Sequence, residues 1–135
     1  MNRYILPLLL LPSIAWAELQ FTETWIKNLP PPVPVRAGYM TIHNPQTAAL
    51  TIVSLRSDAF ANIEIHRTIE QDGMMHMEQI PQLTVEPGST VHLSPGGLHL
   101  MLMRPVEPTK PGDLVEITIL LDDGSEQALT LTVKP

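Results

Sequence analysis

Soft and borderline metal ligands gather in one part of this chain. The segment from residue 66 to residue 103 holds five of the six methionines other than Met1 and four of the five histidines, and the chain has no cysteine. Thioether sulfur suits Cu(I) and is a poor ligand for hard ions, and imidazole completes such a site without adding charge. The segment therefore predicts a copper site. Its candidate ligands are His66, Met74, Met75, His76, Met77, His92, His99, Met101 and Met103.

The absence of cysteine excludes one class of copper protein. An electron-transfer site of the blue-copper type needs a cysteine thiolate together with two histidines, and this chain has no thiol. In an oxidising compartment thiolates are lost to disulfides, whereas a thioether is lost only by oxidation to the sulfoxide. Methionine and histidine are therefore durable copper ligands for an exported protein.

The first residues of the chain predict export. Arg3 supplies a positive charge, residues 5–11 form an apolar run, and Ala15-Trp16-Ala17 has the pattern of a cleavage site, as in a secretory signal peptide. The apolar run is short for a membrane anchor, although a retained tether is the alternative. We expect a signal peptide over residues 1–17 and a soluble copper-binding β-domain over residues 18–135, periplasmic in a Gram-negative bacterium.

The elements that must position the ligands are predicted to be strands. Segments rich in β-branched and aliphatic residues, several with a period of two, are separated by turn signals such as Asp72-Gly73 and Pro95-Gly96-Gly97. The proline-rich residues 29–34 read as a rigid loop after a first strand. Strands at such spacing are typical of one antiparallel β-sandwich or barrel. The predicted strands cover residues 50–55, 63–69, 91–93, 98–103, 115–121 and 128–133.

Alternation of side chains places several candidate ligands on one face of the sheet. In residues 98–103 the leucines point to one face, while His99, Met101 and Met103 point to the other. In residues 63–69 the isoleucines point inward, so His66 points outward. These two strands therefore predict a ligand row on the face opposite the core.

The sequence does not decide which face of the sheet each residue of the methionine-rich segment, residues 74–77, occupies. Met75 and Met77 share one face of a strand there, and Met74 and His76 share the other. The pattern does not decide which pair meets His66, so His76 remains an alternative ligand. Met103 is open in the same way, between a place beside the metal and core packing.

The order and spacing of four residues resemble a known family. His66, Met77, His99 and Met101 fit the pattern H-x10-M-x21-H-x-M, the copper motif of the PCu(A)C family of periplasmic copper chaperones. His92 and His43 lie outside this motif and are expected to be ordinary histidines. Further segments look like the family in the same order and extend the resemblance over nearly the whole mature chain: residues 38–42, 72–75, 95–103 and 111–113.

The resemblance implies an all-β fold, a cupredoxin-like Greek-key β-barrel or sandwich, that binds one Cu(I) per chain through His66, Met77, His99 and Met101. It also implies delivery of copper to the dinuclear copper center of cytochrome c oxidase, often beside a Sco-type protein. We expect a monomer. Some family members continue into a tail rich in methionine and histidine that is thought to take Cu(II). This chain stops at Pro135 without such a tail, which puts a second site in doubt.

Other functions are weighed against copper delivery. A net charge of −6 and the lack of a basic stripe argue against nucleic acid binding. We expect no enzyme, because the sequence offers neither an activated serine triad nor a zinc ligand set with an open position. Copper buffering or resistance is one alternative. A β-sandwich interaction module without metal, whose methionines form an adhesive patch, is the other.

Overall fold

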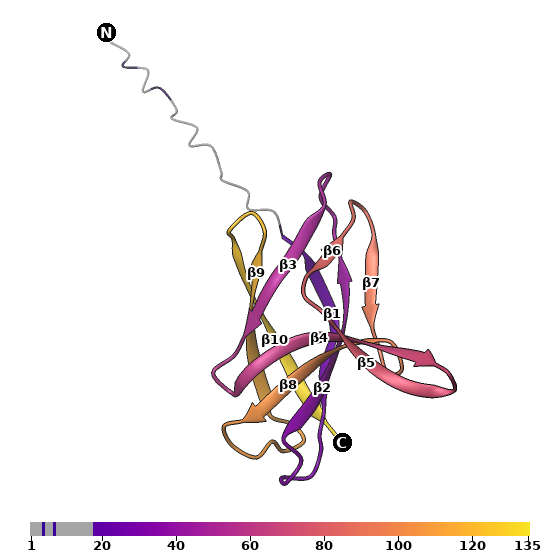
Figure 1. Cartoon of the computed structure of the whole chain (residues 1–135). Coiled ribbons are helices and arrows are strands. Elements are labelled where there is room, and N and C mark those ends of the chain that lie inside the picture. The colour runs from indigo at the N-terminus through magenta and orange to yellow at the C-terminus, as the bar shows by residue number, and fades with distance from the viewer. Residues whose placement is uncertain (1–3, 5–6, 8–17) are drawn as a thin grey trace.

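Ten strands account for the regular structure in the computed structural model, which describes Tyr4, Pro7 and residues 18–135 (Figure 1). Most of the predicted signal peptide, including its cleavage site, lies outside the described residues. No described residue is in a helix, so an all-β fold is confirmed. The strands are β1 Gln20–Lys27, β2 Val35–His43, β3 Leu50–Arg56, β4 Phe60–Gln71, β5 Met74–Ile80, β6 Leu83–Val85, β7 Thr90–Leu93, β8 Leu98–Pro105, β9 Leu114–Leu121 and β10 Glu126–Lys134.

The strands form one folded sheet in the order β5-β4-β8-β2-β1-β10-β9-β3-β6, with β7 paired to β2. All of these pairings are antiparallel except that of β1 with β10, which is parallel. Within residues 18–135 the hydrogen-bonded path ends at β5 on one side and at β6 on the other. The sheet is therefore an open sandwich, which agrees with the predicted fold class.

The core is made of aliphatic side chains that alternate with outward-facing residues along the strands. Leu100 and Leu102 of β8 meet Ile117 and Ile119 of β9 in a single buried cluster, and each of the four is at most 1% exposed. Burying one such side chain contributes about 1.5–3 kcal/mol relative to leaving it in water. None of the four residues of the predicted copper motif belongs to this cluster.

Close packing fixes β8 against β2. Gly38 of β2 lies opposite Leu100, and a Cβ atom built on it would stand 3.0 Å from Leu102 Cδ1 and 3.2 Å from Leu100 Cβ. A side chain at this position would require the leucines of β8 to move by a few tenths of an ångström. Gly38 therefore holds the strand that carries His99 at its place in the sheet.

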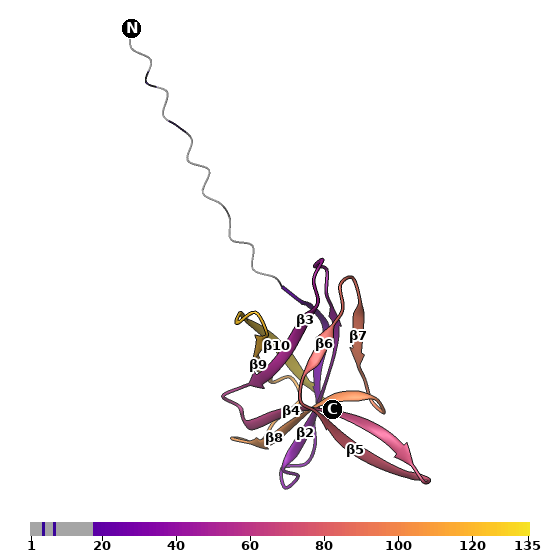
Figure 2. The same ribbon diagram turned by 45° about the horizontal axis from the view of Figure 1, so that its top comes forward.

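A tight turn sets the register of the hairpin formed by β4 and β5. Asp72 and Gly73 have positive φ values of 54° and 75°, as in the two-residue turn preferred by hairpins. The turn pairs Thr68 with Met77 and Ile69 with His76. Figures 1 and 2 show this hairpin reaching outward from the body of the sheet. Its outer strand, β5, lies at the edge of the sheet and is exposed along almost its whole length.

Candidate metal centre

Two histidines lie directly opposite each other at the center of the predicted site. His66 of β4 is the cross-strand partner of His99 of β8. Their ring centroids are 6.1 Å apart and the ring planes differ by 32°. Their neighbours Ile65 and Leu100 are buried in the core, so the histidines occupy the outer face, as the alternation of side chains predicted.

The hydrogen bond made by His99 shows which of its nitrogens is free. His99 Nδ1 lies 3.1 Å from the carbonyl oxygen of Gly97. A carbonyl only accepts hydrogen bonds, so Nδ1 carries the proton and Nε2 keeps its lone pair. Nε2 is buried and has no hydrogen-bond partner among the described residues. Because such an orphaned group carries a desolvation penalty of about 1–3 kcal/mol, His99 is ready to bind a metal through Nε2.

His66 presents the other nitrogen. Its Nε2 lies 2.8 Å from Glu64 Oε2, and a carboxylate accepts, so the proton is on Nε2 and the lone pair is on Nδ1. Nδ1 is buried, and residues 18–135 supply it with no hydrogen-bond partner. Two imidazole lone pairs are thus buried and unpaired on one face of adjacent strands. This arrangement fits a metal ion.

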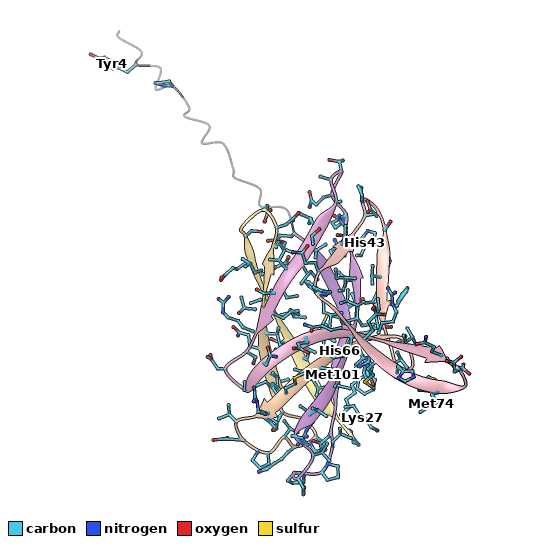
Figure 3. The ribbon with its side chains drawn as sticks, viewed as in Figure 1. Tyr4, Lys27, His43, His66, Met74 and Met101 are labelled. Atoms are coloured by element: carbon cyan, nitrogen blue, oxygen red, sulfur yellow. The ribbon has the colours of Figure 1, made fainter. Side chains whose placement is uncertain are left out.

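Met101 is the next outward-facing residue of β8 after His99. It is half-buried, and it lies opposite Glu64 on β4 and opposite Ala37 on β2. Figure 3 shows Met101 close to His66, where β4 and β8 run side by side. The structure therefore brings His66, His99 and Met101 together.

Met77 approaches the same face from the hairpin. It pairs with Thr68, two residues from His66 on the same face of β4, and its side chain is 60% exposed. Diagonal neighbours on a sheet are about 7–8 Å apart, within reach of a long side chain. The register puts Met77 and Met101 on opposite sides of His66 along the strand. Three candidate donors thus lie on the body of the sheet and the fourth lies on its edge strand.

The pairing of β4 with β5 also decides which face of the sheet each residue of the methionine-rich segment occupies. Met75 pairs with Glu70 and therefore shares the outer face with Met77, whereas His76 pairs with Ile69 and points to the other face. Met74, labelled in Figure 3, is on the side of His76, far out along the hairpin. The structure thus does not bring His76 to His66.

The remaining candidates surround the site or lie away from it. Met103 follows Met101 on the outer face, where Asn62 Nδ2 donates to its sulfur at 3.9 Å. His92 is exposed on β7, with its Nδ1 3.2 Å from the hydroxyl of Thr41. Met40, a methionine outside the predicted ligands, is 2% exposed and belongs to the core. Among residues 18–135, no hydrogen bond joins Met103 or His92 to either of the paired imidazoles.

The chemistry of the site rests on neutral donors. Within the part of the chain that the structure describes, no group of three or more histidine, aspartate or glutamate side chains could hold a metal ion. The candidate ligands that accompany His66 and His99 on this face are the thioethers of Met77 and Met101, while the carboxylate of Glu64 is hydrogen-bonded to His66. A set of two imidazoles and two thioethers is soft, carries no charge, and suits Cu(I) better than Zn²⁺ or a hard ion.

Comparisons with known proteins show the family of the chain. The LpqE-like family model matches residues 19–133, almost the whole described domain. The chain belongs to the LpqE-like family. One relative is RP573 of Rickettsia prowazekii, which is 30% identical over an alignment of 123 residues; the match covers 88% of this LpqE-like chain and 68% of RP573.

Solved structures place this LpqE-like protein among PCuAC-type domains. The Cu(I) form of DR1885 from Deinococcus radiodurans is 30% identical, with a TM-score of 0.68 over 82% of this chain and 74% of DR1885. The copper-bound PCuAC domain of PmoF2 is 18% identical, with a TM-score of 0.74 over 89% and 95% of the two chains, and shares the fold. The family predicted from the sequence is confirmed. Among the described residues, no helix is long and apolar enough to span a membrane.

Proposed function

We propose that this LpqE-like protein is an exported metallochaperone that carries one Cu(I) per chain and passes it to an acceptor protein. The observation that carries the proposal is the pair of opposed histidines, His66 and His99, each with one buried lone pair that no described residue engages. A buried, unpaired lone pair is unfavourable unless a ligand uses it. Cu(I) uses both lone pairs at once and takes its remaining donors from Met101 and Met77.

Export is part of the proposal. The signal-peptide pattern of residues 1–17 supports it, and so does the family description, which names an LpqE-like lipoprotein. In the periplasm of a Gram-negative cell, thioether ligands keep their function where thiolates would oxidise. The chemistry of the site and the proposed location are therefore consistent.

Delivery follows from the nature of the donors and from their exposure. Neutral imidazoles and thioethers hold Cu(I) without the charge attraction that a thiolate gives, so an acceptor with two cysteines is the stronger binder. Met77 is exposed on the edge strand, which leaves one side of the site open to an approaching thiolate. The acceptor we propose is the dinuclear copper domain of cytochrome c oxidase, with a Sco-type protein as a second partner.

Copper binding is tested by titrating residues 18–135 with Cu(I) in competition with bicinchoninate, with Zn²⁺ present in excess. We expect one Cu(I) per chain and no displacement by Zn²⁺. The absence of Cu(I) binding would contradict the proposal and would favour an interaction module without metal.

Delivery needs a separate experiment. The Cu(I)-loaded protein is mixed with a reduced oxidase copper domain, the two proteins are separated by size exclusion, and the copper in each is measured. We expect copper to move to the acceptor, and deletion of the gene to lower oxidase activity at limiting copper. Retention of copper, together with a deletion that changes copper tolerance but not oxidase activity, would favour buffering instead.

A further inference from the structure

Among the described residues, Glu64 is the one acidic side chain hydrogen-bonded to the histidine pair. We propose that it is a positioning residue that fixes the proton of His66 on Nε2, so that His66 binds copper through Nδ1 while His99 binds through Nε2. The inference rests on the proposed function for the identity of the metal. Its geometric part, the choice of nitrogen, concerns the metal-free protein and is tested there.

The contact between Glu64 and His66 is short and shielded. Oε2 of Glu64 lies 2.8 Å from His66 Nε2, and the two side chains are only 24% and 13% exposed. They are two residues apart on β4, on the same face of the strand. Asn62, two residues further back on that face, donates from Nδ2 to Glu64 Oε1 at 3.2 Å. Glu64 is thus held in place from the side away from His66.

Glu64 acts from outside the ligand set. Its two carboxylate oxygens are already engaged, one by His66 and the other by Asn62. It contacts the nitrogen of His66 that bears the proton, while the lone pair is on the other ring nitrogen. A carboxylate in that position orients a ligating imidazole, fixes its tautomer and raises its basicity toward the metal.

The two histidines are fixed by different acceptors. Gly97 offers a backbone carbonyl to His99 Nδ1, and no substitution of a side chain removes that oxygen. Glu64 offers a side chain to His66 Nε2. Without Glu64, the proton of His66 is free to move to Nδ1, or the ring is free to turn over, and either change takes the lone pair away from the site. A single side-chain substitution can therefore free His66 to change its tautomer or its ring orientation.

The test compares Glu64→Ala and Glu64→Gln with Glu70→Gln in residues 18–135. Glu70 is a matched control, since it lies on the same face of the same strand but is exposed and pairs with Met75. Long-range proton–nitrogen NMR spectra of the metal-free proteins report the tautomer of His66. We expect the Nε2-protonated form in the unmodified protein and in Glu70→Gln, and a mixture of both tautomers in Glu64→Ala.

Copper affinity provides the second measurement. We expect Glu64→Ala to bind Cu(I) about 10–100-fold more weakly, the range found for outer partners of metal ligands. Glu64→Gln should fall between, because its amide oxygen can still accept from Nε2. Glu70→Gln should stay within about twofold of the unmodified protein. On loading with Cu(I), the nitrogen signals of His66 Nδ1 and His99 Nε2 should shift most.

The outcomes separate the two proposals. The positioning role is overturned if Glu64→Ala keeps the single Nε2-protonated tautomer, or if its Cu(I) affinity stays within twofold. If the unmodified protein binds no Cu(I), the proposed function fails, and the tautomer spectra still decide what Glu64 does. Amide spectra establish that each variant is folded. If Glu64→Ala does not fold, the test rests on the His66 tautomer and the Cu(I) affinity of Glu64→Gln. If neither differs from the unmodified protein, the positioning role is overturned.

Discussion

His66 and His99 lie opposite each other on β4 and β8, but the ring nitrogen that is buried without a hydrogen-bond partner among the described residues is Nδ1 in His66 and Nε2 in His99. Cross-strand partners have similar backbone positions, so two histidines in the same rotamer would leave the same ring nitrogen without a partner. The difference arises from their hydrogen bonds, one to the carboxylate of Glu64 and one to the carbonyl of Gly97. The protein thus holds both imidazoles in defined tautomers before any metal arrives.

Replacing Met101 tests the thioether part of the site. Met101→Leu keeps the apolar volume nearly constant, which usually costs less than about 1.5 kcal/mol of stability, but it removes a soft donor. We expect the fold to survive and the Cu(I) affinity to fall at least about tenfold, measured by chelator competition. Met103→Leu is the matched control, one step along the same face, and should change the affinity little. Equal binding by both variants would rule out Met101 as a ligand.

The metal-free protein should be folded. Its buried cluster draws on strands from both ends of the chain, unlike small zinc domains that unfold when the metal is removed. A dispersed amide spectrum of the apo protein is the expected result, and a collapsed spectrum would count against it. Copper should still raise the melting temperature, because a ligand at 100 times its dissociation constant stabilises the native state by about 2.7 kcal/mol.

Copper binding should reduce the local opening of the hairpin formed by β4 and β5. Met77 is carried by the edge strand, while His99 and Met101 are carried by β8 in the body of the sheet. An ion shared between them therefore ties the edge strand down. We expect amide hydrogen exchange in β5 to slow on Cu(I) binding, with β9 as an internal control that should not change. Unchanged exchange in β5 would mean that Met77 does not take part.

Peroxide should oxidise the methionines in the order of their exposure. Met77, at 60% exposed, should react before the half-buried Met101, and Met40, at 2%, should react last. Because a sulfoxide is no longer a soft donor, Cu(I) capacity should fall as Met77 and then Met101 are converted. Peptide mass spectrometry and copper titration on the same samples check this order. Full capacity after oxidation of both residues would contradict the thioether site.

Tyr39 should ionise at unusually high pH. Burial raises the pKa of its phenol above the ordinary value of 10.0, because the charged form is poorly solvated there. After removal of residues 1–17 it is the single tyrosine, so its ultraviolet absorbance reports it directly. Since the folded-state pKa is raised, this stabilising contribution is complete below the unfolded pKa and is lost as the pH rises through the folded pKa. Tyr39→Phe should weaken that alkaline decline in the free energy of unfolding; an unchanged decline would contradict this.

Strands with a clear apolar alternation could be predicted from the sequence. The row of His99, Met101 and Met103 opposite the leucines of β8 was one of these, because Leu100 and Leu102 are buried in the core while Met101 and Met103 are only partly buried. The predicted segments from residue 50 onward each lie within an observed strand. Apolar and polar residues alternate in the sequence wherever only one face of a strand packs against the core.

Other parts of the fold carry no such signal. In β1 a bulge between Thr22 and Trp25, with Glu23 at a φ of 53°, interrupts the alternation. In β2 the buried position 36 is an arginine, whose guanidinium donates to the carbonyls of Val33 and Val35. Such residues look polar or irregular in the sequence. Their pairing depends on neighbours distant along the chain.

The site was predictable in part for the same reason. The parity of Met77 could not be read from residues 74–80, because that edge strand is exposed on both faces and shows no alternation. It follows only from the register set by the Asp72-Gly73 turn. The contact of Glu64 with His66 depends on rotamers, although the spacing of two along a strand was a signal that the residues share a face.

The parallel pairing of β1 with β10 has a consequence for how the molecule is made. Trp25 pairs with Thr132, so the first strand is enclosed only when the last one has arrived. Contacts so distant in sequence form late and slow folding. During synthesis the sheet therefore cannot be completed until the final residues of the chain are available. A chain cut short before β10 would leave one edge of β1 unpaired, so the topology ties completion of the sheet to the last strand made.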